Sequence, residues 1–128
     1  MFRLDKRKIF LLYHYYLLGK VPKIVPENEK EKARIVWLND CLIQEKFLQE
    51  KITKKMKTGW AFFRSPPLER AILTYATYEL LCGNKADLYK MIIDQTVNFS
   101  KSYLGKDKYK YINKILDSIS KERNVCPV

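Results

Sequence analysis

The chain has 128 residues, of which 47% are hydrophobic and 30% charged, a balance typical of one globular domain and not of a disordered segment. It contains only four glycines and five prolines, so turns are few, and we expect long helices instead of many short strands. The net charge of +11 creates a positive surface potential, which favours nucleic acid, an anionic membrane or an acidic protein as partner. The alternative is a lysine-rich surface that has no partner.

The three cysteines, Cys41, Cys82 and Cys126, are odd in number and show no C-x-x-C spacing, which argues against a disulfide framework and against a zinc site. We expect three reduced thiols in a cytoplasmic protein, with Cys41 and Cys82 buried and inert. No phosphate-binding loop, zinc-protease motif or nucleophile elbow is present. We therefore predict no enzyme activity, no cofactor and no metal site.

The stretch 9–18 is apolar and aromatic and follows basic residues, so it faintly resembles a signal peptide. It contains His14 and three tyrosines, lacks a small-x-small cleavage site and is too short to span a bilayer. Because Ile9, Leu12 and Tyr16 recur at helical spacing, we interpret 4–18 as a buried first helix. His14 is the single histidine, and we expect it to pack in the core.

Gly19 ends this helix, and two prolines make the segment 21–26 a loop. Asn28 is the expected N-cap of a helical pattern that runs from 29 to about 57. That pattern is long for one globular helix, which predicts a break near Asn39–Asp40 or at Gln44.

A short apolar connector, 60–63, leads to a helix over 67–81, with Ser65 as the expected N-cap and prolines in the first turn. This helix is apolar on nearly every side, which is typical of a central, buried helix. Further helices are predicted over 87–104 and 108–121, the last one capped by Asp107. The sequence therefore predicts an all-α fold.

Basic residues gather in two stretches, each with one acid. They are Arg3, Lys6, Arg7 and Lys8 at the N-terminus, and Lys101, Lys106, Lys108, Lys110 and Lys114 further along. Tyr103, Tyr109 and Tyr111 are interleaved with the second stretch. Lysines bind phosphates, and exposed rings stack on unpaired bases, so the combination favours single-stranded RNA over duplex DNA. Because Tyr109 and Tyr111 are two residues apart on one helix, at least one should be exposed; the alternative is that both are core or rim residues.

Four segments resemble the NusB family in order and spacing. The segment 68–80, LERAILTYATYEL, is similar to the family helix v-E-R-a-I-L-R-l-A-x-Y-E-L, with Thr74 at the place of an arginine. The segments 89–103 and 107–117 are similar to y-K-v-x-I-N-E-A-v-e-l-A-K-x-f and d-s-x-K-F-V-N-G-v-L-D. Gly59 and Trp60, followed by Arg64, are similar to the lead-in G-W-s-l-e-R-l.

The resemblance implies two packed three-helix bundles in a single domain, 1–128, with an N-terminal subdomain over about 1–57 and a C-terminal one over about 58–123. It also implies binding of boxA-type single-stranded RNA in transcription antitermination or rRNA transcription. In that role the family acts jointly with NusE, the small-subunit ribosomal protein that doubles as an elongation factor, and with the transcription elongation complex.

The resemblance and the basic clusters together assign candidate residues. For RNA they are Arg3, Lys6, Arg7, Lys8, Lys101, Asp107, Lys108, Lys110 and Tyr111, with Tyr111 expected to stack on a base. For NusE they are Glu69, Arg70 and Leu73. Two alternatives stay open: an interaction module that keeps the fold without RNA binding, and, since such domains also precede rRNA cytosine methyltransferase domains, part of an enzyme, although no cofactor-binding segment is seen. The chain is expected to be a monomer or a homodimer.

Overall fold

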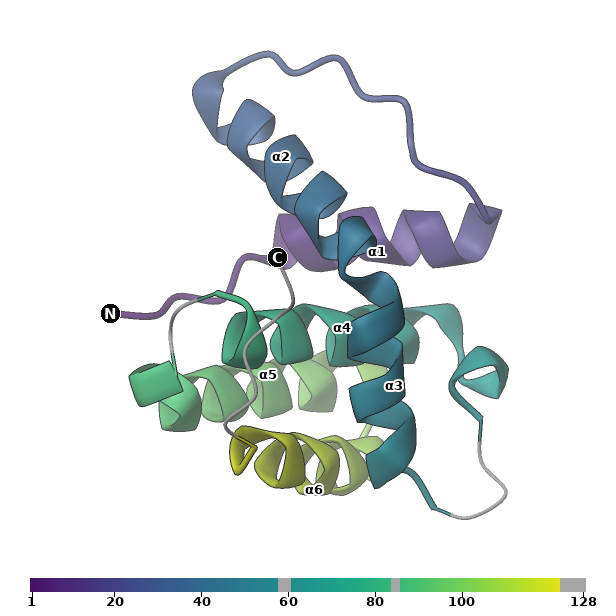
Figure 1. Cartoon of the computed structure of the whole chain (residues 1–128), viewed down its shortest axis with the longest axis vertical. Coiled ribbons are helices and arrows are strands. Elements are labelled where there is room, and N and C mark those ends of the chain that lie inside the picture. Colours follow the sequence, from purple (N-terminus) through teal and green to yellow (C-terminus); the bar gives the residue numbers. More distant parts are fainter. Residues whose placement is uncertain (58–60, 84–85, 123–128) are drawn as a thin grey trace.

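The computed structural model describes residues 1–57, 61–83 and 86–122, and within them all regular secondary structure is helical (Figure 1). The prediction of an all-α fold is therefore confirmed. The elements in chain order are α1 (Lys6–Leu18), α2 (Glu29–Ile43), α3 (Glu45–Lys55), the 3-10 turn η1 (Phe62–Arg64), α4 (Pro67–Leu81), the 3-10 turn η2 (Ala86–Leu88), α5 (Tyr89–Leu104) and α6 (Lys108–Ser120).

Local chemistry sets the ends of the first helices. The carboxylate of Asp5 accepts a hydrogen bond from the backbone N–H of Arg7 at 3.0 Å, and α1 begins at the next residue after this cap. Gly19 ends α1 in the left-handed conformation, with φ of 72°. Asn28 caps α2 by accepting from the N–H of Glu31 at 2.9 Å, which confirms the predicted cap. The predicted break falls at Gln44, between α2 and α3.

Three predicted helix starts need correction. The first helix begins at Lys6 and not at residue 4, because the N–H groups of Leu4 and Asp5 donate to side chains elsewhere in the chain. Ser65 is not the N-cap of α4, which follows Pro66 without any side-chain cap, since Pro67 at the first position has no N–H to satisfy. The residues before Tyr89 form the turn η2, so α5 starts two residues later than predicted.

Helix α4 is the centre of the molecule. It is buried from Ala71 to Leu81 and packs against α1, α3, α5 and α6. Figure 1 shows α1 on one side of it and α5 with α6 on the other. Because each fully buried aliphatic side chain stabilises the fold by about 1.5–3 kcal/mol, a helix that is apolar on all sides is most stable at this central place. The prediction of a central, buried helix over 67–81 is confirmed.

Helix α2 lies at the periphery and contacts α1 and α3 (Figure 1). Two polar contacts hold it to α4. The indole N–H of Trp37 donates to the buried carboxylate of Glu79 at 3.1 Å, and the hydroxyl of Tyr78 donates to Asp40. Helix α3 then crosses α4 and reaches α6. The division into subdomains at about residue 57 stays a prediction.

Two predictions about single residues are wrong. His14 is exposed, because it lies on the face of α1 opposite the buried Ile9 and Leu12. Cys82 is disulfide-bonded, so not all thiols are reduced. Cys41 is buried and free as predicted, and burial raises the pKa of its thiol, which keeps it protonated and unreactive.

Part of the sequence evidence lies outside the described residues. Gly59 and Trp60 of the resembling lead-in and Cys126 belong to this part. Among the residues that are described, no helix is long and apolar enough to cross a membrane. Nor does any group of three or more histidine, cysteine, aspartate or glutamate side chains there have the arrangement to hold a metal ion.

Candidate nucleic-acid interface

The N-terminal arm, residues 1–5, is fastened to α5 by one amide side chain. The carbonyl oxygen of Gln95 accepts from the N–H of Leu4 at 2.7 Å, and its NH2 group donates to the backbone carbonyl of Phe2 at 2.9 Å. Phe2 itself is buried, and the N–H of Asp5 donates to the hydroxyl of Tyr75 at 3.0 Å. The basic arm therefore has a defined place beside α5.

An aromatic cluster joins the start of α1 to the last turns of α5. The ring of Phe10 lies 6.2 Å from that of Phe99 and 5.9 Å from that of Tyr103, measured between centroids. Phe99 and Tyr103 stack on each other with centroids 4.3 Å apart. Such ring pairs are worth about 0.5–1.5 kcal/mol beyond their buried area. Helix α5 therefore connects the two basic stretches that are far apart in the sequence.

The outer surface between α5 and α6 has a hollow of about 370 Å³, which we call the α5–α6 hollow. Its lining is mostly polar and includes Lys101, Tyr109, Lys110 and the amides of Asn98 and Asn113. The ammonium of Lys101 lies 4.6 Å from the centroid of the Tyr109 ring. Cations, an aromatic face and amide groups are the three kinds of group that proteins use for phosphate, base stacking and base edges of single-stranded RNA.

Tyr111 lies on the opposite flank of α6, against the core and towards α4. Its hydroxyl oxygen is buried, and burial together with the nearby charge of Glu69 raises its pKa. Tyr109 and Tyr111 are both half-buried, so the prediction that one of them would be exposed is wrong. Because they are two residues apart on one helix, Tyr109 and Tyr111 lie on different sides of the buried stripe of α6.

The first turn of α4 meets the first turn of α6 through a buried carboxylate. Glu69 exposes 2% of its surface, and its Oε1 lies 3.7 Å from the ammonium of Lys108. Burial raises the pKa of Glu69, and the charge of Lys108 opposes part of that rise. Lys108 therefore lies between the α4 and α6 helices and is less exposed than Lys110.

The three residues predicted to face NusE are unequal in exposure. Leu73 is fully buried and Glu69 nearly so, which leaves neither with a surface for a partner in this structure. Arg70 is half-buried, with its guanidinium 5.0 Å from the centroid of the Tyr16 ring. The binding role of the three stays a prediction.

The N-terminal cations divide between two sides of α1. Arg3, Lys6 and Arg7 are exposed. Lys8 is half-buried, and its ammonium lies 5.1 Å from the Trp37 ring on α2. The structure thus brings Lys101 and Lys110 together in the α5–α6 hollow and holds the arm beside α5, while Lys8 faces α2. Asp107 is exposed at the N-cap position of α6 without a side-chain cap bond.

Sequence reasoning missed two residues of this surface. Tyr109 lines the α5–α6 hollow; the sequence shows it within the basic stretch, but the prediction gives the stacking role to Tyr111, and its position two residues from Tyr111 was the signal that it lies on the other flank. Gln95 fastens the arm through hydrogen bonds that span more than ninety residues of sequence, for which no local pattern gives a signal.

The chain is similar to known proteins of one family. The family model described as the NusB family matches residues 12–121. The chain is similar to the transcription antitermination protein NusB of Methylacidiphilum infernorum, with 29% identity over 99 residues that cover 76% of this chain and 67% of that protein. It is also similar to the NusB proteins of Paraburkholderia phymatum, with 42% identity over 60 residues, and Burkholderia mallei, with 43% over 54 residues.

These last two alignments cover 46% and 42% of this chain and only 40% and 37% of the relatives. No solved structure matches the chain. The family model nevertheless extends from α1 to the end of α6, over far more than half of the sequence. The chain belongs to the NusB family.

Proposed function

We propose that this protein binds boxA-type single-stranded RNA together with NusE, and that it acts in transcription antitermination or rRNA transcription. It does so by binding alone, without catalysis, in the cytoplasm where transcription takes place. The observation that carries the proposal is that α5 both holds the basic arm through Gln95 and forms one wall of the α5–α6 hollow. Membership of the NusB family supports it.

In this proposal the cations supply affinity. Lys101, Lys110 and the exposed Arg3 of the arm neutralise RNA phosphates and release bound counterions, so affinity falls as salt rises. The ring of Tyr109 receives an unpaired base, and Lys101 above its face adds to the attraction for a phosphate. Tyr111 supports the first turn of α6 from beneath, because its hydroxyl is buried against the core side of this helix.

For the protein partner we propose a smaller contact than the sequence predicted. Of the three candidate residues, Arg70 has surface to offer, whereas Glu69 and Leu73 form the packed layer beneath it. A NusE contact at the start of α4 then depends on Arg70 directly and on the other two through packing.

The test compares two lysine–tyrosine pairs. Tyr109→Ala removes the proposed stacking ring, and we expect affinity for single-stranded RNA to fall about tenfold, since stacking on an aromatic ring contributes about 1–3 kcal/mol per base. Tyr89→Ala is the matched control, because Lys90 lies over the Tyr89 ring at 5.9 Å outside the hollow. Fluorescence anisotropy with labelled RNA measures both. Equal affinities of the two variants would argue against this surface.

A further inference from the structure

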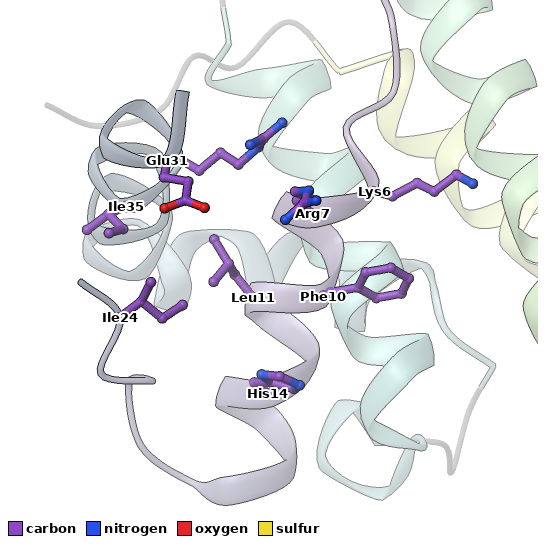
Figure 2. A pocket seen from close by; sticks show the side chains of 9 residues that line it. Lys6, Arg7, Phe10, Leu11, His14, Ile24, Glu31 and Ile35 are labelled. Atoms are coloured by element: carbon purple, nitrogen blue, oxygen red, sulfur yellow. The ribbon is translucent and has the colours of Figure 1, made fainter. Parts of the chain in front are cut away.

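A second hollow, of about 540 Å³, lies on another side of α1, and we call it the α1–α2 hollow. Its walls are α1, the loop 20–28 and α2 (Figure 2). Leu11, Ile24 and Ile35 gather on the α2 side of α1, whereas Lys6 and Phe10 point the other way (Figure 2). The floor is therefore aliphatic. Its volume lies within the range of about 300–1,000 Å³ that is typical of ligand-binding clefts.

The loop 20–28 beside this hollow exposes several apolar side chains to solvent. Val21, Ile24 and Val25 expose 46%, 42% and 86% of their surfaces, and Val36 on α2 exposes 68%. Single exposed apolar residues are common, but a group of them along one loop next to an aliphatic hollow is typical of a protein contact. The loop and the aliphatic floor are not used by the proposed RNA surface, although Lys6 and Arg7 among the lining residues are also RNA candidates.

The charged groups around the hollow are mainly positive. Lys6, Arg7 and Arg34 line it, with Glu31 as the acid among its lining residues. A carboxylate oxygen of Glu31 accepts from the backbone N–H of Glu27 at 2.7 Å, which ties it to the loop. Arg34 pairs with Asp5 at 2.9 Å, and Lys6 is exposed but points away from the floor (Figure 2), so Arg7 is the exposed cation on this side.

We propose that the α1–α2 hollow is a docking site for a segment of another protein in which aliphatic side chains alternate with aspartate or glutamate. The aliphatic groups of the segment cover Leu11, Ile24 and Ile35, and one of its carboxylates pairs with Arg7. Charge complementarity with Arg7, beside a lining that has three cations and one acid, selects an acidic occupant.

Two other occupants fit the chemistry less well. The floor is aliphatic and the Phe10 ring is engaged with Phe99 and Tyr103, which leaves a nucleobase only the His14 ring among the lining residues to stack on. A second copy of this chain would bring another +11 charge against the same basic edge, which opposes association.

The experiment uses the full chain and an array of peptides that combine leucine, isoleucine or valine with aspartate or glutamate. Each peptide is paired with a version that has glutamine in place of every acid. We expect acidic peptides to bind and their neutral versions to bind at least about tenfold more weakly. In the wild-type protein, NMR shifts induced by the peptide should map to residues 7–14, 20–28 and 31–35.

Ile24→Glu places a carboxylate in the floor and should weaken peptide binding about tenfold or more. Val25→Glu is the matched control, since the neighbouring residue is 86% exposed and does not line the hollow, and its affinity should equal that of wild type. Equal unfolding free energies of the two variants show that both fold.

Several results overturn the proposal. They are no preference for acidic over neutral peptides, shifts that map elsewhere, or an equal loss of binding in both variants. If Ile24→Glu but not Val25→Glu weakens RNA binding, the occupant is RNA. If light scattering finds a dimer that only Ile24→Glu dissociates, the occupant is a second copy. Because neither variant lies in the α5–α6 hollow, a failure here leaves the proposed RNA function standing.

Discussion

Glu69 is buried, although the motif that contains it implies a position on the surface. The resemblance places it on a partner surface, but the fold buries it at the first turn of α4, 3.7 Å from Lys108. An acid in the first turn is favoured by the helix dipole, while burial disfavours its charged form. Burial is the larger effect on its pKa, which is raised.

This raised pKa leads to an expected pH dependence. The folded state holds a proton on Glu69 more tightly than the unfolded state does. The contribution of that carboxyl to stability is therefore fully present below its ordinary pKa of 4.5 and is lost as pH rises through the folded-state pKa. Glu69→Gln removes the titration. We expect the unfolding free energy of the variant to rise relative to wild type as pH increases above 4.5.

Urea unfolding at several pH values measures this difference. Asp117→Asn serves as the control, since Asp117 is exposed and pairs with Lys121 on the surface. A difference between Glu69→Gln and wild type that stays constant with pH would contradict the raised pKa.

Tyr111 provides a second expectation at this scale. Its ring packs against the core and its hydroxyl is buried, so Tyr111→Ala removes side-chain contacts with the core. For a half-buried ring we expect a loss of about 2 kcal/mol in unfolding free energy, less than the 3–5 kcal/mol typical of fully buried aromatic residues. Tyr111→Phe keeps the ring, so its unfolding free energy should fall by less than that of Tyr111→Ala. Thermal and urea unfolding measure both, and an unchanged stability of Tyr111→Ala would show that the ring is on the surface.

At the scale of the elements, α1 and α4 form the most extensive helix pair. Thr74 lies inside this contact with none of its surface exposed, and its hydroxyl shares a hydrogen bond of 3.0 Å with that of Tyr16. The resembling family has an arginine at this position. The close approach of α1 leaves no route from Thr74 to solvent, which explains why a small hydroxyl residue suits this chain.

Thr74→Arg restores the family residue and tests this packing. A charged side chain in a filled, buried position should lower the unfolding free energy by about 3 kcal/mol or more. Thr74→Val keeps the shape and removes the hydroxyl, and it should cost about 1 kcal/mol. Urea unfolding distinguishes the two. If Thr74→Arg is as stable as wild type, α1 does not pack on this face as described.

The elements were largely predictable because their signals are local. The apolar spacing of α4, the Asn28 cap and the break at Gln44 all come from neighbouring residues, and the structure confirms them. The start of α1 was not, because the N–H groups of Leu4 and Asp5 bind side chains far along the chain.

Long-range contacts also limited how much of the candidate site could be predicted from the sequence. Both basic stretches could be found by composition. Their connection through Gln95 and through the ring of Phe10 depends on tertiary packing. In the resembling family the residue at position 95 is a glutamate, which when ionised cannot donate to the carbonyl of Phe2. Glutamine donates and accepts at once, as both bonds of the arm require.

At the scale of the whole molecule, the charge of +11 is present on several surfaces, so composition alone does not locate a binding face. Lys54 and Lys55 end α3, are exposed and do not line the α5–α6 hollow. Only cations that touch RNA phosphates contribute to the salt dependence of binding. Salt titration therefore separates lysines of the interface from those that only face solvent.

Lys110→Ala is expected to lower the slope of log affinity against log salt by about 0.7, the contribution of one phosphate contact on a single strand. Lys54→Ala should leave the slope unchanged. Anisotropy titrations at a series of salt concentrations give both values. Equal slopes for the two variants would place the RNA on another face.

We propose that this NusB-family chain binds boxA-type RNA jointly with NusE. The most direct measurement is the affinity of the purified protein for a boxA RNA and for a scrambled RNA of the same composition, each with and without NusE, at physiological salt. We expect the boxA RNA to bind more tightly than the scrambled one, and NusE to increase that preference. Equal affinities for the two RNAs, in the presence of NusE as in its absence, would contradict the claim and favour an interaction module without specific RNA binding.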